Sequence, residues 1–191
     1  LASMSNVSLA ESVSSGTSVA TASGSDVDAS TTLTYSISSG NDDSKFTINS
    51  STGAITTAAT LDYEDETQYT LVVAVSDGSL STTTNQVINI TNVNEAPTLA
   101  SMSNVSLAEN VSSGTSVATA SGSDVDASTT LTYSITAGNG DGKFAINSST
   151  GAITTAAALD YETTTSYTLT VQVSDGSLTA TTNQVVNITD V

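Results

Sequence analysis

The sequence contains one long stretch twice, and this internal repeat limits the possible folds more than any other feature. Residues 1–93 align without a gap with residues 99–191, at an offset of 98, and the two copies differ at only 16 of 93 positions. Each copy is about as long as an immunoglobulin-like sandwich and is expected to bury its own core. The sequence therefore predicts two similar domains, residues 1–96 and residues 97–191.

Alternating apolar residues predict that each copy is built from short β strands. Tyr69, Leu71, Val73 and Val75 place an apolar side chain at every second position, as on a strand with one face against a core. Further strands are expected at residues 7–10, 18–22, 33–37 and 86–90, with two more strands and a Ser/Thr/Gly turn within residues 46–58. About seven short strands per copy predict an all-β chain of two tandem seven-stranded Greek-key β-sandwiches of the immunoglobulin-like type.

The charge of the chain favours cations as partners. The formal net charge is −17, and only Lys45 and Lys143 oppose nineteen carboxylates. Nucleic acid and anionic membranes would be repelled and are excluded as natural partners, whereas a merely soluble, acid-rich surface would carry the same charge. Because cysteine and histidine are both absent, any metal must be bound by oxygen.

The chain also shows neither a signal peptide nor an apolar run of the ~18 residues needed to cross a bilayer. We therefore expect a segment of a longer secreted or cell-surface protein, without membrane insertion of its own.

Pairs of acids at alternate positions suggest a calcium site. Asp124 and Asp126 project to the same side of an extended backbone, and so do Asp26 and Asp28 in the first copy. Asp62 and Glu64 have the same spacing. Such close carboxylates repel unless a cation lies between them. Ca²⁺ accepts about 6–8 oxygens, whereas Zn²⁺ prefers His or Cys and Mg²⁺ tolerates a flexible cage poorly. Solvated surface acids remain the alternative for any single pair.

An enzyme is not expected. Asp62 and Glu64 lie on one strand and cannot flank a glycosidic bond from two sides. A nucleophilic serine would have no histidine as its base. The acids of residues 41–46, together with Asp65 and Glu66, are assigned to turns and solvated surface.

Five motifs in order resemble the calcium-binding motifs of cadherin repeats: "LAES", "LDYE", the connector "NVNEAP", the Asp-Val-Asp pair of the second copy and "VSDG". The resemblance covers nearly all of both copies. It implies cadherin-type sandwiches and a Ca²⁺ site at their boundary, with these ligands: Glu11, Asp62, Glu64, Asn92, Asn94, Glu95, Asp124, Asp126 and Asp175. The family connector resembles D-x-N-D-N-x-P and the family holds up to three ions. This connector is one residue shorter and Glu95 is its only acid, so we expect two or three ions.

The connector is expected to become rigid when Ca²⁺ binds. Pro97 fixes its own φ angle, and Ala96 before it is restricted to extended conformations. The acids at the outer ends of the two copies have no neighbouring repeat in this sequence. We therefore expect useful affinity, of about 10⁻⁴–10⁻³ M or somewhat tighter, only at the central boundary.

The function expected from this resemblance is that of a calcium-stiffened spacer for adhesion in a large extracellular protein, whose partners are Ca²⁺ and neighbouring repeats. The Ser/Thr-rich texture looks like the repeats of bacterial surface adhesins or secreted polysaccharide-associated proteins. The alternative is a Ca²⁺-dependent module that binds polysaccharide or a second copy of the protein. Most tyrosines fit core positions, which disfavours an aromatic platform for polysaccharide.

Overall fold

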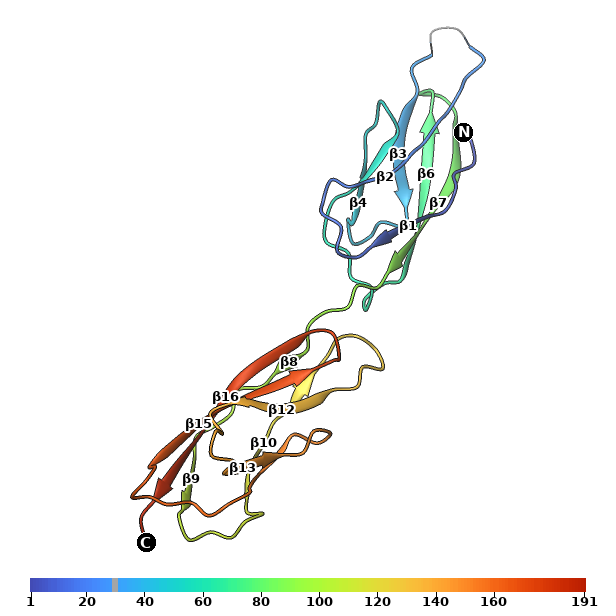
Figure 1. Cartoon of the computed structure of the whole chain (residues 1–191). Helices are drawn as coiled ribbons and strands as arrows, with labels where there is room; N and C mark the ends of the chain where they lie inside the picture. Colours follow the sequence, from blue (N-terminus) through green and yellow to red (C-terminus); the bar gives the residue numbers. More distant parts are fainter. Residues whose placement is uncertain (29–30) are drawn as a thin grey trace. The chain divides into compact units, whose positions relative to one another are not determined.

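The chain folds into two compact units, the first unit Leu1–Val93 and the second unit Asn94–Val191. The structure is a computed structural model that describes residues 1–28 and 31–191. All regular elements of the described residues are β strands (Figure 1), which confirms the predicted all-β class. The same residues include no helix with the length and apolar character that crossing a membrane requires. The sequence-based boundary between residues 96 and 97 stays a prediction.

The first unit is a sandwich of two sheets. One sheet has the order β1-β7-β6-β3 and the other the order β2-β5-β4. The strands are β1 (Val7–Ala10), β2 (Ser18–Thr21), β3 (Thr34–Ser39), β4 (Phe46–Ile48), β5 (Ala54–Thr57), β6 (Gln68–Ser76) and β7 (Ser81–Thr91). The predicted strands are all present, and β7 begins five residues earlier than residue 86, where its apolar alternation starts.

The second unit repeats this arrangement and adds a short two-stranded sheet. Its large sheets have the orders β12-β15-β16-β9 and β10-β14-β13, and β8 pairs with β11. The strands are β8 (Thr98–Leu99), β9 (Val105–Ala108), β10 (Ser116–Thr119), β11 (Gly122–Ser123), β12 (Thr132–Ala137), β13 (Phe144–Ile146), β14 (Ala152–Thr155), β15 (Ser166–Ser174) and β16 (Thr179–Thr189).

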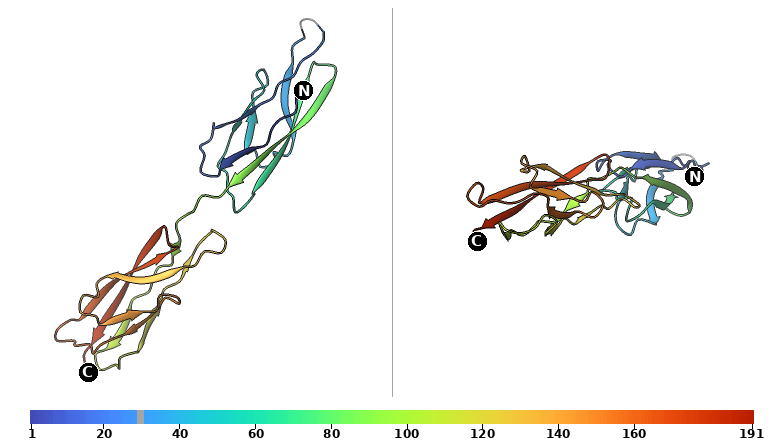
Figure 2. Two further views of the ribbon diagram at one scale, coloured as in Figure 1. Left: turned by 45° about the vertical axis from the view of Figure 1, so that its right-hand side comes forward. Right: turned by 60° about the horizontal axis from the view of Figure 1, so that its bottom comes forward.

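In each unit a short strand near the start of the unit pairs in parallel with its last strand. Val7 of β1 is opposite Ile88 of β7, and Val105 of β9 is opposite Val186 of β16. The left view of Figure 2 shows the dark blue β1 beside the green β7 in the first unit. The remaining strand pairs are antiparallel, as expected for a Greek-key sandwich.

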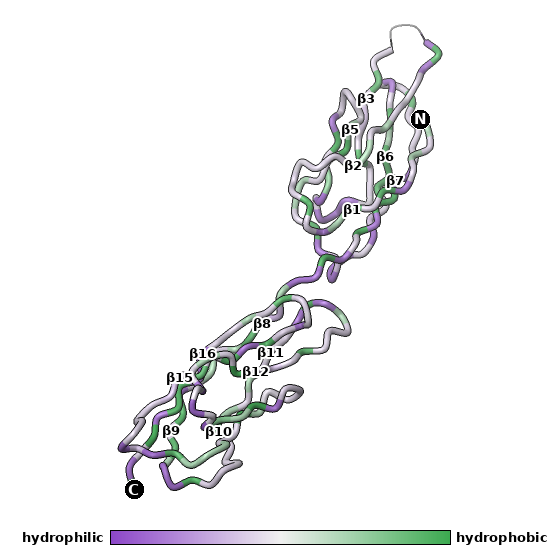
Figure 3. The backbone as a smooth tube through the Cα atoms, in the orientation of Figure 1, coloured by the Kyte–Doolittle hydropathy of each residue, from purple (hydrophilic) through white to green (hydrophobic). Residues whose placement is uncertain are grey.

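The core of each unit lies between its two sheets. Along β6 the side chains of Tyr69, Leu71, Val73 and Val75 are buried, which confirms the alternation expected from the sequence. Phe46 of the opposite sheet meets Tyr69 edge-on, with ring centroids 5.1 Å apart. Figure 3 shows hydrophobic and hydrophilic residues alternating along the strands. Burial of this apolar face, at roughly 25 cal/mol per Å², is the main stabilising contribution to each sandwich.

Gly40 ends the strand β3 in a conformation that only glycine adopts easily. Its φ is +79°, and a Cβ at this position would overlap the main-chain oxygen of Thr70 on β6. Gly138 occupies the same position in the second unit with a φ of +80° and meets Thr168 in the same way. Glycine is therefore required here both by the backbone angle and by the close approach of the neighbouring strand.

Candidate metal centre

Glu11 is a buried carboxylate that joins three segments at one end of the first unit. It follows β1 directly, and its side chain is only 8% exposed. One carboxylate oxygen accepts a hydrogen bond from the Val93 N–H and the other from the Tyr63 N–H, both at 2.7 Å. Its own N–H donates to the Thr91 carbonyl at 3.2 Å. Glu11 thus fastens the end of β7 and the loop after β5 to the end of β1.

The loop after β5 brings two more predicted ligands to this end of the first unit. Asp62 Oδ1 accepts hydrogen bonds from the N–H groups of Glu64 and Asp65, at 3.0 and 3.2 Å, which closes a tight turn. The turn brings a carboxylate oxygen of Glu64 within 4.8 Å of one of Glu11. Glu64 is exposed, whereas Glu11 is buried, so one side of this acid pair opens to solvent.

The connector residues after Val93 belong to the second unit and are held there by acids. Asn94 Nδ2 donates to Asp175 Oδ2 at 2.7 Å, and the Glu95 N–H donates to Asp126 Oδ2 at 2.9 Å. Pro97 is buried, and β8 begins at the next residue. Within its own unit, the connector is therefore joined by hydrogen bonds to two segments, the one that contains Asp126 and the one that contains Asp175.

Asp124 and Asp126 follow β11 and form a short turn. The Asp126 N–H donates to Asp124 Oδ1 at 2.9 Å. The second oxygen of Asp124, Oδ2, is buried and finds no hydrogen-bond donor among the described residues. A buried carboxylate oxygen without a donor is costly, and a cation is one of the few groups that can compensate it.

Asp175 lies in the turn between β15 and β16. Its Oδ1 accepts hydrogen bonds from the N–H groups of Ser177 and Leu178, and its Oδ2 accepts the bond from Asn94. The Asn94 side chain, followed by the two main-chain donors, lowers the pKa of Asp175 below its usual value. Asp77 holds the equivalent place in the first unit, and there main-chain donors from Leu80 and Ser79 lower its pKa. Both carboxylates are therefore favoured in the charged form.

A further acid cluster lies at the other end of the second unit. Carboxylate oxygens of Glu109, Asp160 and Glu162 lie within 4.8 Å of one another. Glu109 Oε2 accepts the Tyr161 N–H at 2.8 Å, as Glu11 does with Tyr63. These acids are the second-copy equivalents of Glu11, Asp62 and Glu64, and the predicted ligand set did not include them. The repeat alignment alone is the signal that finds them.

The structure divides the nine predicted ligands between the units. Glu11, Asp62, Glu64 and Asn92 belong to the first unit, and Asn94, Glu95, Asp124, Asp126 and Asp175 to the second. Within the first unit Glu11 lies close to Glu64, and Asn92 is exposed after β7. Within the second unit hydrogen bonds connect Asn94 to Asp175 and Glu95 to Asp126. The joint site at the boundary stays a prediction.

The predicted ligands of both units suit a hard cation. Each of their side chains offers a carboxylate or amide oxygen as the ligand atom, and Ca²⁺ binds such oxygens at about 2.3–2.6 Å in irregular shells. The two lysines of the chain donate hydrogen bonds to main-chain carbonyls, Lys45 to Thr60 and Lys143 to Ala158. The oxygen ligands and the buried Oδ2 of Asp124 therefore fit Ca²⁺, which would be held by the predicted ligands named above.

Comparison with known proteins gives the same family twice along the chain. The model of the cadherin domain matches residues 5–91 and again residues 103–189. Human Cadherin EGF LAG seven-pass G-type receptor 2 is 37% identical over 176 residues, which cover 90% of this chain and 6% of that protein. Protocadherin-like wing polarity protein stan of Drosophila melanogaster is 41% identical over 191 residues, covering 92% of this chain and 5% of that protein. The chain thus spans only a small part of these relatives.

Solved structures share the fold. The crystal structure of human Protocadherin-24 EC1-2 (form II) has a TM-score of 0.78 at 22% identity and covers 100% of this chain and 97% of that one. The Protocadherin gammaB7 EC3-6 cis-dimer structure has a TM-score of 0.71 at 28% identity, covering 97% of this chain and 45% of that chain. With both copies matched by the family model, the chain belongs to the cadherin domain family and carries two such domains in tandem.

Proposed function

We propose that the chain is a calcium-stiffened spacer of a larger extracellular adhesion protein. In this proposal Ca²⁺ is bound jointly by the acids at the end of the first domain, the connector and the acids at the start of the second domain. The nine predicted ligands are the proposed set, with two or three ions. The domain boundary at residue 96 and the extracellular location belong to the same proposal.

The observation that carries this proposal is how each part of the connector is anchored. Glu11 accepts the N–H of Val93, while Asp126 accepts the N–H of Glu95 two residues later. A short stretch of chain is thus held by acids of the first domain on one side and of the second domain on the other. Acids that gather around the same few residues repel one another unless a cation lies among them. Calcium supplies that charge and coordinates oxygen.

Two measurements on the whole chain test the proposal. Small-angle scattering with Ca²⁺ and with a chelator should give a longer and stiffer particle in Ca²⁺, and identical profiles would contradict it. Calorimetry should show that Asp124→Asn weakens Ca²⁺ binding about tenfold or more, because Asp124 offers a buried oxygen with no protein donor. The matched control is Asp26→Asn, at the equivalent position of the first domain, which should leave the binding unchanged.

The alternative is a Ca²⁺-dependent module that binds polysaccharide or a second copy. Tyr69 and Tyr167 are buried and the other four tyrosines are only partly exposed, which disfavours a tyrosine platform for a sugar ring. Polysaccharide pull-downs and sedimentation with and without Ca²⁺ separate this alternative from the spacer. The bacterial parent expected from the Ser/Thr-rich texture stays a prediction, and the animal relatives named above do not support it.

A further inference from the structure

The first domain carries an open groove at one end, beside the turn between β6 and β7, which we call the end groove. Its lining includes four apolar residues and two acids: Leu1, Leu33, Val75, Leu80, Asp26 and Asp77. Val75 is buried and Leu80 is exposed, so apolar surface extends here from the core out to solvent. Such a groove can hold an apolar side chain while its acids accept hydrogen bonds.

The internal repeat gives a counterpart in the second domain for every residue that lines the end groove. At the offset of 98, only Ser81 and Thr82 are replaced, by Thr179 and Ala180, and the other lining residues are identical. The turn that holds Asp26 is also alike. The N–H two residues after Asp26 donates to its Oδ1 at 2.7 Å, and the equivalent bond in the second domain is 2.9 Å long. The two domains therefore offer nearly the same residues and the same turn at this end.

In the second domain the connector is bound to the counterparts of the end groove. Asn94 Nδ2 donates to Asp175 Oδ2 at 2.7 Å, and Thr98 Oγ1 donates to the Ser123 carbonyl at 3.2 Å. Asp175 and Ser123 are the counterparts of two lining residues. Pro97 lies between the two anchored residues in sequence and is buried. The second domain thus shows what kind of segment this surface holds.

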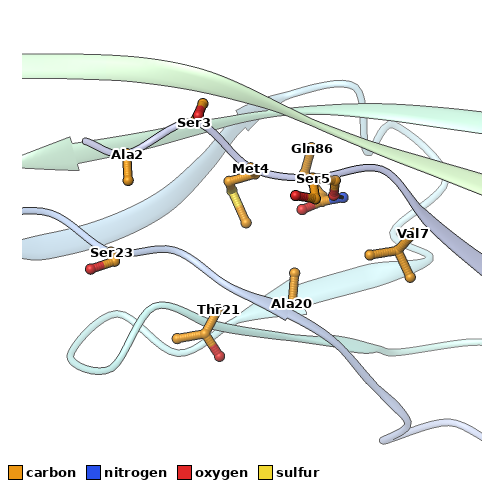
Figure 4. A pocket seen from close by; sticks show the side chains of 9 residues that line it. All are labelled: Ala2, Ser3, Met4, Ser5, Val7, Ala20, Thr21, Ser23 and Gln86. Carbon is orange, nitrogen blue, oxygen red and sulfur yellow. Dashed lines mark hydrogen bonds between the residues drawn. The ribbon is translucent and has the colours of Figure 1, made fainter.

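A second groove, which we call the side groove, gives a contrast. It lies beside Met4 and Ala20 in the first domain (Figure 4) and has a volume of about 260 Å³, and a groove of about 270 Å³ lies at the equivalent residues of the second domain. That surface is open in both domains, so the repeat provides no occupant for it. At the end groove the domains differ, since Leu80 is 76% exposed and its counterpart Leu178 is 41% exposed.

The chemistry of the end groove favours the same kind of segment. Main-chain donors lower the pKa of Asp77, so its charged carboxylate readily accepts a hydrogen bond from a side-chain amide. A proline has no N–H to leave unpaired among apolar side chains, and its fixed φ reduces the entropy lost on binding. Without a cation, Asp26 and Asp77 would repel an acidic side chain. An uncharged segment with an asparagine three residues before a proline therefore fits best.

We propose that the end groove of the first domain binds an extended, uncharged Asn-x-x-Pro segment of another polypeptide. The asparagine side chain donates to Asp77, and the main-chain N–H of the next residue donates to Asp28, as the counterparts of both acids accept such bonds in the second domain. The proline lies among Leu33, Val75 and Leu80. This site uses none of the nine predicted calcium ligands and does not depend on the proposed function.

NMR of the whole chain in a chelator tests the proposal. The probe is the peptide Val-Asn-Gln-Ala-Pro with blocked ends, which copies residues 93–97 except that glutamine replaces the acid. Added peptide should shift the methyl signals of Leu33, Val75 and Leu80 until they saturate, and should leave those of Met4 and Ala20 in the side groove unchanged. No shift at the end groove with millimolar peptide, or equal shifts at both grooves, would overturn the proposal.

Two altered peptides test which groups are recognised. Alanine in place of the asparagine removes the donor to Asp77 and should weaken binding about threefold or more. Alanine in place of the proline adds an N–H and frees the backbone, and should also weaken binding about threefold or more. Equal binding of the original peptide and either altered peptide would contradict the proposal.

Variants of the whole chain locate the site. Leu80→Ala shortens an exposed side chain of the end groove and should weaken binding of the original peptide about threefold. Leu178→Ala is the matched control, because it makes the same change in the second domain, where the connector is already bound, so the affinity should stay the same. An unchanged affinity in Leu80→Ala, or an equal loss in both variants, would rule out the end groove as the binding site.

Discussion

The buried carboxylate of Glu11 should contribute strongly to the stability of the first domain even without calcium. In Glu11→Ala, the Tyr63 and Val93 N–H groups both lose a charged acceptor that lies 2.7 Å away. A hydrogen bond to a charged group contributes about 1.5–3 kcal/mol. Water reaches part of the vacated site, so the lower end of that range applies and the loss is about 3 kcal/mol. For a domain of this size, that lowers the melting temperature by roughly 12 °C or more.

The assay is urea unfolding in a chelator, followed by NMR signals from each domain. The first domain should lose about 3 kcal/mol at constant slope against urea, while the second domain is unchanged. Glu109→Ala is the matched variant in the second domain. Glu109 accepts one N–H, that of Tyr161, whereas Glu11 accepts two, so its removal should cost about half as much, about 1.5 kcal/mol. A loss below ~1 kcal/mol for Glu11→Ala, or a larger loss for Glu109→Ala, would refute this reasoning.

Three further predictions concern the pKa of Asp175, the core and a turn glycine. In a chelator, NMR titration should show that the pKa of Asp175 in the folded protein lies below its usual value. Asp175 therefore stabilises the fold at a pH above the pKa of the unfolded chain, and this stabilisation is lost as the pH falls through the pKa of the folded protein. Asn94→Ala should raise the pKa of Asp175 and leave that of Asp77 unchanged, since only main-chain donors lower the latter; equal shifts at both would argue against the role of Asn94. Leu71→Ala, at a fully buried position, should cost about 2–5 kcal/mol in urea unfolding, whereas Leu80→Ala, 76% exposed, should stay within ~0.5 kcal/mol, and similar costs would contradict the described core. Gly40→Ala should destabilise the first domain more than Gly16→Ala in thermal unfolding, because both have positive φ but only Gly40 meets a neighbouring strand; the reverse order would count against that close contact.

The fold class and the core faces could be predicted because they depend on local patterns. Alternation at Tyr69, Leu71 and Val73 determines which side of β6 faces the core, whatever the neighbouring strands are. The parallel pairing of β1 with β7 could not be predicted in the same way, since Val7 and Ile88 are far apart in sequence and no local signal specifies the partner. The early start of β7 has a similar cause, because Ser81 to Thr84 join the sheet through main-chain pairing with β6 and carry no apolar alternation.

The candidate site could be predicted in its residue types but only partly in its geometry. The acids of the Asp-Val-Asp and "LDYE" motifs stand out because like charges are close in sequence. The burial of Glu11 and its two hydrogen bonds depend on segments 52 and 82 residues away, so they appear only in the folded domain. Gln86 was missed as well. A single glutamine in an apolar alternation looks like a solvent-facing residue, and only the fold shows that Gln86 is buried and donates a hydrogen bond to the Ser5 carbonyl.

The parallel pairing of β1 with β7 has a mechanical consequence for the first domain. A pull on the two ends of the first domain draws β1 backward and β7 forward along their common direction. The ladder from Val7 to Ala10, and the bond from the Glu11 N–H to the Thr91 carbonyl beyond it, are then loaded in shear and share the force. An antiparallel hairpin pulled from its open end would instead unzip one bond at a time. In each domain, the hydrogen bonds between the two end strands must therefore break together before the domain yields to an applied force.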